Sequence, residues 1–232
     1  VHCDGGLRPL VTVPARKLHP SPRLTAEQNA LVETLAIGCH AIDRAAPKPD
    51  ETVLIIGAGP IGLSALEFAK VAGARVIVMD IASARLDFVQ AALGVADTVP
   101  ASGTPADLEA VARLTAGRMA EVVVDATGSA ASMAAALGYC SSGGRLVYVG
   151  ITQREVSFPH APVMHRRELS ILASRNARSQ DFDRIIGLIE AGRIDTAPWI
   201  THRLPFAHLP EAFPALLAPG SGVIKAVVAM PS

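Results

Sequence analysis

Short apolar runs alternate with longer stretches of mixed polarity through the middle of the chain. The apolar runs lie at 53–56, 75–79, 121–125, 145–150 and 168–174. Because each run is brief and almost free of polar residues, the pattern predicts strands buried on both faces, as in a parallel sheet. Stretches with helical spacing separate them, at 61–72, 83–93, 106–115 and 129–137. The alternation predicts an α/β protein built on a doubly wound parallel sheet, the Rossmann arrangement.

The pattern is different at both ends of the chain. Residues 7–13 alternate loosely in polarity, which predicts one edge strand, and a helical pattern follows at 25–46. After Arg175 the alternation of strand and helix is lost. The pattern there predicts helices near 181–191 and 207–217 and a strand at 223–230. We therefore expect the two ends to belong to a structural unit other than the sheet.

Composition and charge narrow the possible classes of function. Of the 232 residues, 50% are hydrophobic, and Lys+Arg and Asp+Glu both number 21. A chain without net charge has no field that attracts DNA, RNA or anionic lipid, so nucleic-acid binding is not expected. No apolar run reaches the length of a membrane span. Cys3, Cys39 and Cys140 are scattered, which disfavours a disulfide framework or a zinc knuckle and favours a reducing cytoplasm.

The strongest motif is VLIIGAGPIGL at 53–63, where a Gly-x-Gly-x-x-Gly pattern joins a predicted strand to a predicted helix. The first glycine of such a motif permits a tight turn, the second lets a pyrophosphate approach the backbone, and the third lets the helix pack on the strand. The helix N-terminus offers free N–H groups to the phosphates. The motif assigns five residues to a dinucleotide: Gly57, Gly59, Pro60, Ile61 and Gly62.

Asp80 ends the second predicted strand, about 20 residues beyond the motif. A carboxylate there accepts hydrogen bonds from the ribose hydroxyls of NAD and repels the additional phosphate of NADP. Arg85 could shield a 2′-phosphate, but an arginine at this place is more often solvated or stacked near the adenine. Alternatively, the glycines are ordinary turn residues and Asp80 is a strand-end cap, and FAD or S-adenosylmethionine sites share part of this layout. The order and register of the elements favour NAD.

Two later strand ends are expected to face the same cofactor. Ligands of open parallel sheets bind outside the carboxyl ends of the strands, so the residues just beyond those ends are candidates. The simpler alternative is that the glycines among them only form turns. The candidates are Ala126, Thr127 and Gly128 after one strand, and Val149, Gly150 and Ile151 after the next.

Further motifs join these in a fixed order along the chain. They are VETLAIGCHA (32–41), VIVMD (76–80), VVVDATG (122–128), GGRLVYVG (143–150), SRN (174–176) and VIKAVV (223–228). Together with the glycine motif they resemble the medium-chain zinc-type alcohol and polyol dehydrogenases, in the branch of the sorbitol, threonine and sugar-acid dehydrogenases. The runs SRNARSQDF and IDTAPWITHR are similar to those of L-galactonate or L-gulonate 5-dehydrogenases.

The resemblance implies an enzyme of two domains. Remnants of a GroES-like catalytic domain would lie at both ends, at 1–37 and 176–232, and an NAD-binding Rossmann domain would occupy 38–175. The family's catalytic cysteine, its Gly-His-Glu zinc segment and its structural zinc loop would lie upstream of residue 1. We therefore expect a fragment without a complete zinc site, which binds NAD weakly and has no turnover of its own.

The resemblance also assigns two residues to the chemistry. Glu33 occupies the place of a family glutamate beside the catalytic zinc, as a metal ligand or as a partner of its water. The alternative is a glutamate on a helix surface, and Thr34 departs from the family, which has proline there. Arg175 would orient a substrate carboxylate or would form an ion pair between domains. His40, about two helical turns from Glu33, is more simply a packing residue.

The sequence thus favours an NAD-dependent, zinc-type oxidoreductase that oxidises a secondary hydroxyl of a polyol or sugar acid. In the intact enzyme zinc would be a second cofactor. By analogy with the family we expect a cytoplasmic homodimer or homotetramer joined through the strand at 168–174. One alternative is a zinc-free, NADPH-dependent reductase of the quinone-reductase type, against which Asp80 and Glu33 count. Another is a dinucleotide-binding module without catalysis.

Overall fold

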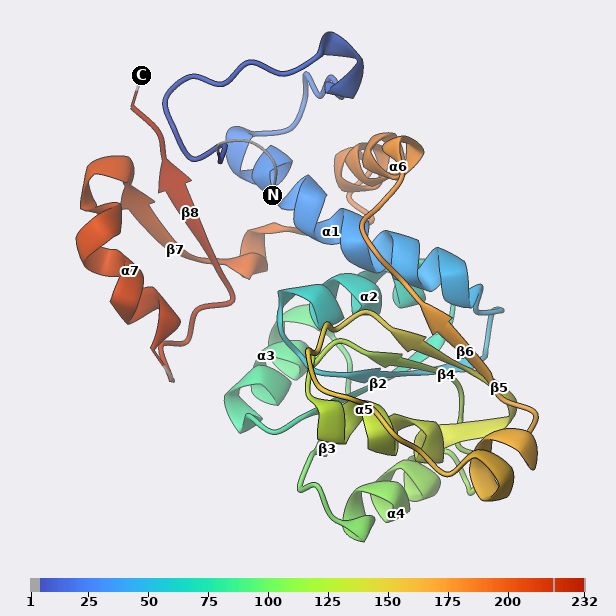
Figure 1. Cartoon of the computed structure of the whole chain (residues 1–232). Helices are drawn as coiled ribbons and strands as arrows, with labels where there is room; N and C mark the ends of the chain where they lie inside the picture. Colours follow the sequence, from blue (N-terminus) through green and yellow to red (C-terminus); the bar gives the residue numbers. More distant parts are fainter. Residues whose placement is uncertain (1–4, 219, 232) are drawn as a thin grey trace. The chain divides into compact units, whose positions relative to one another are not determined.

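The computed structural model describes residues 5–218 and 220–231 and divides the chain into two compact units. The larger unit is Glu33–Asp181, and the smaller combines Val1–Val32 with Phe182–Ser232. The two divisions fall inside helices α1 (Ala26–Ala45) and α6 (Ser179–Glu190) (Figure 1). These units are defined by compactness alone, so the predicted division into functional domains at residues 37 and 175 stays a prediction.

The larger unit contains a six-stranded parallel sheet in the order β3-β2-β1-β4-β5-β6. This is the doubly wound order of dinucleotide-binding folds, in which the strand order reverses between β1 and β4 while all strands stay parallel. The predicted fold class is therefore confirmed. The strands are β1 (Thr52–Ile56), β2 (Arg75–Asp80), β3 (Thr98–Pro100), β4 (Ala120–Asp125), β5 (Cys140–Tyr148) and β6 (Ser170–Ala173).

Helices cover both faces of this sheet. Figure 1 shows α1 and α2 over one face and α4 and α5 over the other. On the α4/α5 face, Val111 and Ala136 pack into a buried cluster with Leu54, Ile77 and Val123 of the strands. β1 is buried at all five positions, and after Thr52 at its start it is a continuous apolar run, as expected of a strand covered on both faces. The helices are α2 (Pro60–Val71), α3 (Ser83–Leu93), α4 (Pro105–Leu114) and α5 (Ala130–Ala136).

Helix α1 lies against α2 through a very close backbone contact. The Ser64 hydroxyl donates to the carbonyl of Leu35 at 2.8 Å and accepts from the N–H of Gly38 at 3.1 Å. A Cβ atom at Gly38 would overlap both the Ser64 side chain and the backbone nitrogen of Ala65. Glycine at position 38 therefore sets how closely these two helices approach.

The smaller unit is built on two parallel strands, β7 (Ile200–Pro205) and β8 (Lys225–Ala229), connected through α7 (Leu209–Leu217). Arg203 on β7 donates two hydrogen bonds to Glu27, at 2.6 and 2.9 Å. His19 stacks on Phe182 and bonds the Asp183 carboxylate at 2.7 Å. Short helical turns in the described part of the chain are η1 (Ala15–Lys17), η2 (Leu137–Tyr139), the π-helical η3 (His160–His165), η4 (Ala197–Trp199) and η5 (Phe206–His208).

Several sequence predictions were wrong in detail. Residues 7–13 form no strand; the segment is exposed, and its loose alternation has no sheet partner among the described residues. The pattern missed β3, which is only three residues long, and β7, where His202 and Arg203 interrupt the apolar run. No helix within 5–218 and 220–231 is both long enough and apolar enough to cross a membrane.

Replacing Gly38 by alanine should destabilise the protein although alanine favours helices. The added methyl group meets backbone atoms of α2 that cannot move aside, which should lower the free energy of unfolding by about 1–3 kcal/mol. Gly187→Ala in α6 is the matched control, because a Cβ there meets open space and should raise stability by up to about 1 kcal/mol. Urea unfolding of both variants measures the difference, and equal effects would contradict the close contact.

Candidate functional site

The residues predicted to bind a dinucleotide meet at one edge of the sheet. Ile56 pairs with Met79 on one side and with Asp125 on the other, and Asp125 pairs with Tyr148. The loops that follow β1, β2, β4 and β5 therefore leave the sheet at the same level. Since the strand order reverses between β1 and β4, these loops border the crevice where ligands of such sheets bind.

The glycine turn after β1 has the geometry that the motif predicts. Gly57 has φ +98°, a backbone conformation that favours glycine, and its N–H donates to Met79 O at 2.8 Å. A Cβ at Gly62 would overlap the carbonyl oxygen of Gly57, so only glycine lets α2 start this close to β1. A Cβ at Gly59, by contrast, would have no neighbour within 4 Å. The turn is closed on the protein side and open on the ligand side.

Helix α2 begins at this turn without a side-chain cap. Gly59 is the N-cap residue and Pro60 the first helical residue, so no hydroxyl or carboxylate of the cap occupies the first N–H groups. Such a helix end carries a positive partial charge and backbone donors, which together bind phosphate. Pro60, Ile61 and Gly62 thus present bare backbone at the place where a pyrophosphate is expected. This open cradle fits a dinucleotide.

Asp80 ties the end of β2 to the glycine turn. One of its carboxylate oxygens accepts from the N–H of Ala58 at 2.6 Å, and the other accepts from the N–H of Ala82 at 2.8 Å. The strand-end cap considered as an alternative is therefore real. A carboxylate offers about four lone-pair positions, so two remain for the hydroxyls of a ribose. Arg85 is half-buried on α3, five residues further on.

The loops after β4 and β5 pack tightly on each other. A Cβ at Gly150 would overlap the backbone nitrogen of Gly128, and one at Gly128 would lie 2.9 Å from the carbonyl oxygen of Ile151. The Thr127 methyl group lies 3.2 Å from the Cβ position of Gly57, which connects this pair of loops to the glycine turn. The predicted binding segment around residue 127 is therefore in contact with both of the others, around residues 57 and 150.

Two apolar side chains are left exposed beside these loops. Ile81, next to Asp80, is 86% exposed, and Ile151, next to Gly150, is 79% exposed. One lies beside β2 and the other beside β5, so they flank the crevice on opposite sides of β1.

A buried carboxylate that the sequence analysis did not assign supports these loops from below. Asp125, the last residue of β4, is 0% exposed. The Asp125 carboxylate accepts three hydrogen bonds. The N–H and the hydroxyl of Thr127 donate at 3.0 and 2.8 Å, and the Ser132 hydroxyl donates at 2.6 Å. Burial, together with the charge of Asp125, raises the pKa of Tyr148 to about 12, so this hydroxyl stays protonated. The sequence signal that could have singled out Asp125 is its place as a charged residue at the end of an apolar run.

The two residues assigned to the chemistry are both exposed. Glu33 lies on α1 with its side chain accessible, whereas Thr34 and Leu35 beside it are buried. Arg175 is exposed just beyond β6, at the carboxyl edge of the sheet. Position 34, where the family has proline, is a threonine in this chain, and helix α1 continues through it without interruption. The assignment of Glu33 and Arg175 to metal or substrate remains a prediction.

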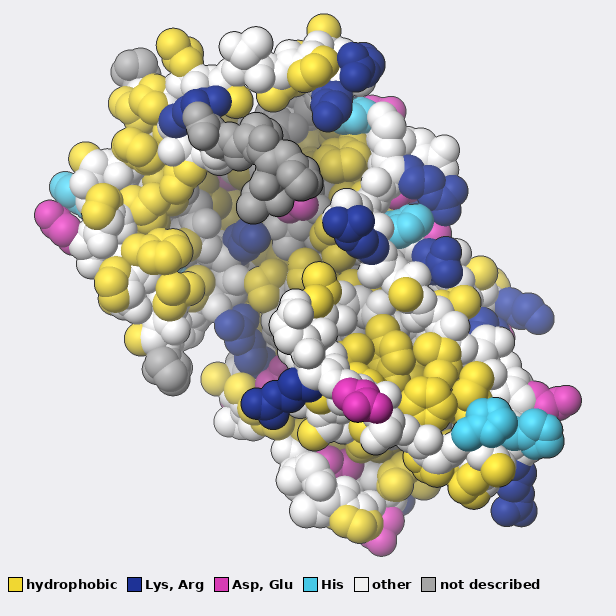
Figure 2. Space-filling view, in the orientation of Figure 1, with side chains coloured by type: hydrophobic (Ala, Val, Ile, Leu, Met, Phe, Trp, Pro, Cys, Tyr) yellow, Lys and Arg dark blue, Asp and Glu magenta, His cyan; other side chains and the backbone are white. Residues whose placement is uncertain are grey.

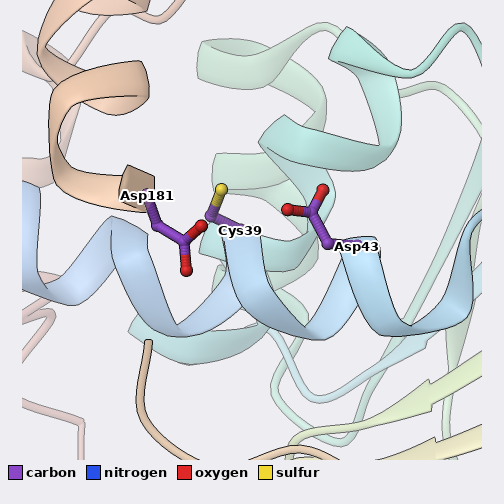
Figure 3. A group of neighbouring side chains, drawn as sticks. All are labelled: Cys39, Asp43 and Asp181. Carbon is purple, nitrogen blue, oxygen red and sulfur yellow. The ribbon is translucent and has the colours of Figure 1, made fainter. Parts of the chain in front are cut away.

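One group of potential metal ligands occurs within residues 5–218 and 220–231. Cys39 and Asp43 lie one turn apart on α1, and Asp181 approaches them from the start of α6 (Figure 3). Their ligand atoms lie within 4.8 Å of one another. Asp181 already accepts a hydrogen bond from the N–H of Arg178 at 2.7 Å, and His40 Nδ1 is 3.8 Å from its carboxylate.

Glu33 does not belong to this group. The residues that the structure describes therefore do not assemble a zinc site around Glu33. The contacts of Asp181 support a structural role at the start of α6. Its carboxylate reaches back to the N–H that precedes α6, as the third residue of a capping box does.

Charge elsewhere agrees with the balanced composition. Figure 2 shows Lys, Arg, Asp and Glu side chains dispersed over the visible face.

The sheet and the glycine turn together define a dinucleotide-binding protein of the doubly wound class.

Comparison with known proteins identifies the family. The model for zinc-binding dehydrogenases matches residues 60–191. The L-galactonate-5-dehydrogenase of Escherichia coli (strain K12) is 36% identical over 229 residues, which are 98% of this chain and 66% of that protein. The chain belongs to the zinc-binding dehydrogenase family, that is, to the medium-chain zinc-type alcohol and polyol dehydrogenases that its motifs resemble.

Solved structures agree with this assignment. A NAD-dependent alcohol dehydrogenase superposes with a TM-score of 0.86 at 28% identity, over 99% of this chain and 66% of that one. A structure described as a short chain alcohol dehydrogenase from E. coli CFT073, in complex with NADH, gives a TM-score of 0.84 at 26% identity, over 94% of this chain and 64% of that one. The chain thus spans less than two thirds of the length of these relatives.

Removing the Asp181 carboxylate should destabilise the start of α6. Asp181→Ala loses the capping hydrogen bond and should lower the free energy of unfolding by about 1 kcal/mol. Asp183→Ala, on the same helix, removes only an exposed pair with His19 and should cost less than about 0.5 kcal/mol. Thermal unfolding of the two variants measures this, and equal losses would argue against the capping role.

Proposed function

We propose that this chain is the coenzyme-binding part of an NAD-dependent dehydrogenase that oxidises a secondary hydroxyl of a polyol or sugar acid. The observation that carries the proposal is the glycine turn, which is closed by Gly62 on the protein side and open at Gly59 toward the crevice. The NADH complex of a structural relative and the substrate in the name of the L-galactonate-5-dehydrogenase support it. The activity of the whole enzyme is part of the proposal.

In this proposal each segment of the crevice binds one part of the coenzyme. The backbone of Gly59, Pro60, Ile61 and Gly62 binds the pyrophosphate at the start of α2, and the free lone pairs of Asp80 accept the adenosine ribose hydroxyls. Arg85 lies beside the adenosine. The loops 126–128 and 149–151 hold the nicotinamide half, because the two halves of such a sheet bind one nucleotide each. The coenzyme supplies the acceptor for a hydride.

Two further residues, Arg175 and Glu33, belong to the substrate side of the proposed enzyme. Arg175, at the carboxyl edge beyond β6, suits a sugar acid because a guanidinium binds a carboxylate with two parallel hydrogen bonds. Glu33 would lie near zinc in the longer enzyme, with the other ligands supplied from outside the described residues. The enzyme would form homodimers or homotetramers through β6, which is an edge strand of the sheet.

Isothermal titration calorimetry with oxidised NAD tests the proposal on the chain itself. The wild-type chain should bind, and Gly59→Ala should reduce the affinity at least about tenfold, because its methyl group stands where the pyrophosphate approaches the backbone. Gly59 has φ −74°, so alanine fits its backbone and the variant should keep its stability. Gly187→Ala, remote from the turn, should bind as the wild type does. A wild-type chain that binds neither NAD nor NADP would overturn the proposal.

Neutralising Asp80 should change the preference between the two coenzymes. Asp80→Asn keeps one oxygen acceptor but removes the charge that repels the 2′-phosphate, so the affinity for NADP relative to NAD should rise about tenfold. The control is Asp87→Asn, an exposed position on α3, which should leave the ratio unchanged. Competition titrations with both coenzymes give the ratio. A wild-type chain that prefers NADP would favour the reductase alternative.

A further inference from the structure

Asp125 is a buried carboxylate without a cationic partner. It is 0% exposed, and every donor to its side chain is neutral: the N–H and hydroxyl of Thr127 and the hydroxyl of Ser132. None of the ion pairs among the described residues includes it. Burying an uncompensated carboxylate costs several kcal/mol, and a neutral asparagine could occupy the same volume. A role in packing therefore does not explain the charge.

The position of Asp125 in the sheet suggests what the charge acts on. It ends β4, one strand from β1, on the side opposite to Asp80, which ends β2. Its carboxylate holds the loop 126–128 through Thr127, and its carbonyl oxygen accepts from the N–H groups of Val149 and Gly150, each at 3.0 Å. The same residue thus fixes both loops that border the second half of the crevice.

Under the proposed function, on which this inference rests, that half of the crevice holds the nicotinamide. The oxidised ring is a cation and the reduced ring is neutral, while the phosphates, riboses and adenine are identical in the two forms. A fixed negative charge behind the loops therefore attracts one form and not the other. Because the carboxylate is buried, water screens this attraction less than it would at the surface.

We propose that Asp125 is a positioning residue whose buried charge makes the site favour the oxidised coenzyme over the reduced one. The hydrogen bonds from Thr127 and Ser132 hold the carboxylate in place against the loop 126–128, while the backbone carbonyl of the same residue holds the loop 149–151. Its effect on the pyrophosphate is the same for either form of the coenzyme and cancels in their comparison. The ratio of the two affinities therefore isolates the effect of the charge on the ring.

The test is the ratio of dissociation constants for NAD⁺ and NADH, measured by calorimetry and by NADH fluorescence in one buffer. In Asp125→Asn this ratio should rise about tenfold over the wild type, because affinity for the cationic form alone is lost. Ser132→Ala removes one hydrogen bond and keeps the charge, so it should weaken both forms by the same factor. Asp80→Asn, a neutralised carboxylate at the adenosine end, should also leave the ratio unchanged.

The outcomes separate the role of the Asp125 charge from the proposed function of the chain. A ratio in Asp125→Asn within twofold of the wild type would overturn the role of the charge, while binding of both forms by the wild type would leave the proposed function intact. A wild-type chain that binds neither form would overturn the proposed function itself. Asp125→Ser is a second neutral variant, and circular dichroism shows which of the two is folded. Loss of the native fold in both would assign the carboxylate to folding alone and overturn the proposal.

Discussion

The contact between Gly62 and the carbonyl of Gly57 sets the geometry of the whole crevice. Because no side chain fits there, α2 begins directly at the end of β1, and its first N–H groups lie at the level where four parallel strands end. The positive φ of Gly57 makes the turn possible, and the open space at Gly59 keeps it accessible. A larger residue at position 62 would separate helix from strand and close the site.

Two carboxylates brace this turn from opposite sides. Asp80 reaches it directly through the N–H of Ala58, and Asp125 reaches it through Thr127, whose methyl group packs near Gly57. The order β2-β1-β4 puts the two carboxylates on opposite sides of the start of α2. In the proposed function, Asp80 would face the adenosine and Asp125 the nicotinamide half of the coenzyme.

Much of this arrangement was predictable because its determinants are local in sequence. Strands buried on both faces gave apolar runs, so the doubly wound fold was predicted correctly. The glycine motif and Asp80 lie within thirty residues of one another and follow neighbouring strands, as the motif predicts, while their role in binding stays a prediction. What was missed depends on side-chain contacts that the hydrophobic pattern does not encode. The role of Asp125 comes from its hydrogen bonds with Ser132 and with the loop after β5, and Cys39 and Asp181 meet although 142 positions separate them. Strand β3, with three residues, gave no periodic signal.

The proposed function requires above all a pyrophosphate bound by the bare backbone at the start of α2. Amide chemical shifts of the isotopically labelled chain, recorded by NMR during titration with NAD⁺, test this most directly. The largest shifts should belong to Gly59, Ile61 and Gly62, with smaller ones at Thr127 and Gly150. Shifts confined to other parts of the chain, or none at saturating coenzyme, would contradict it.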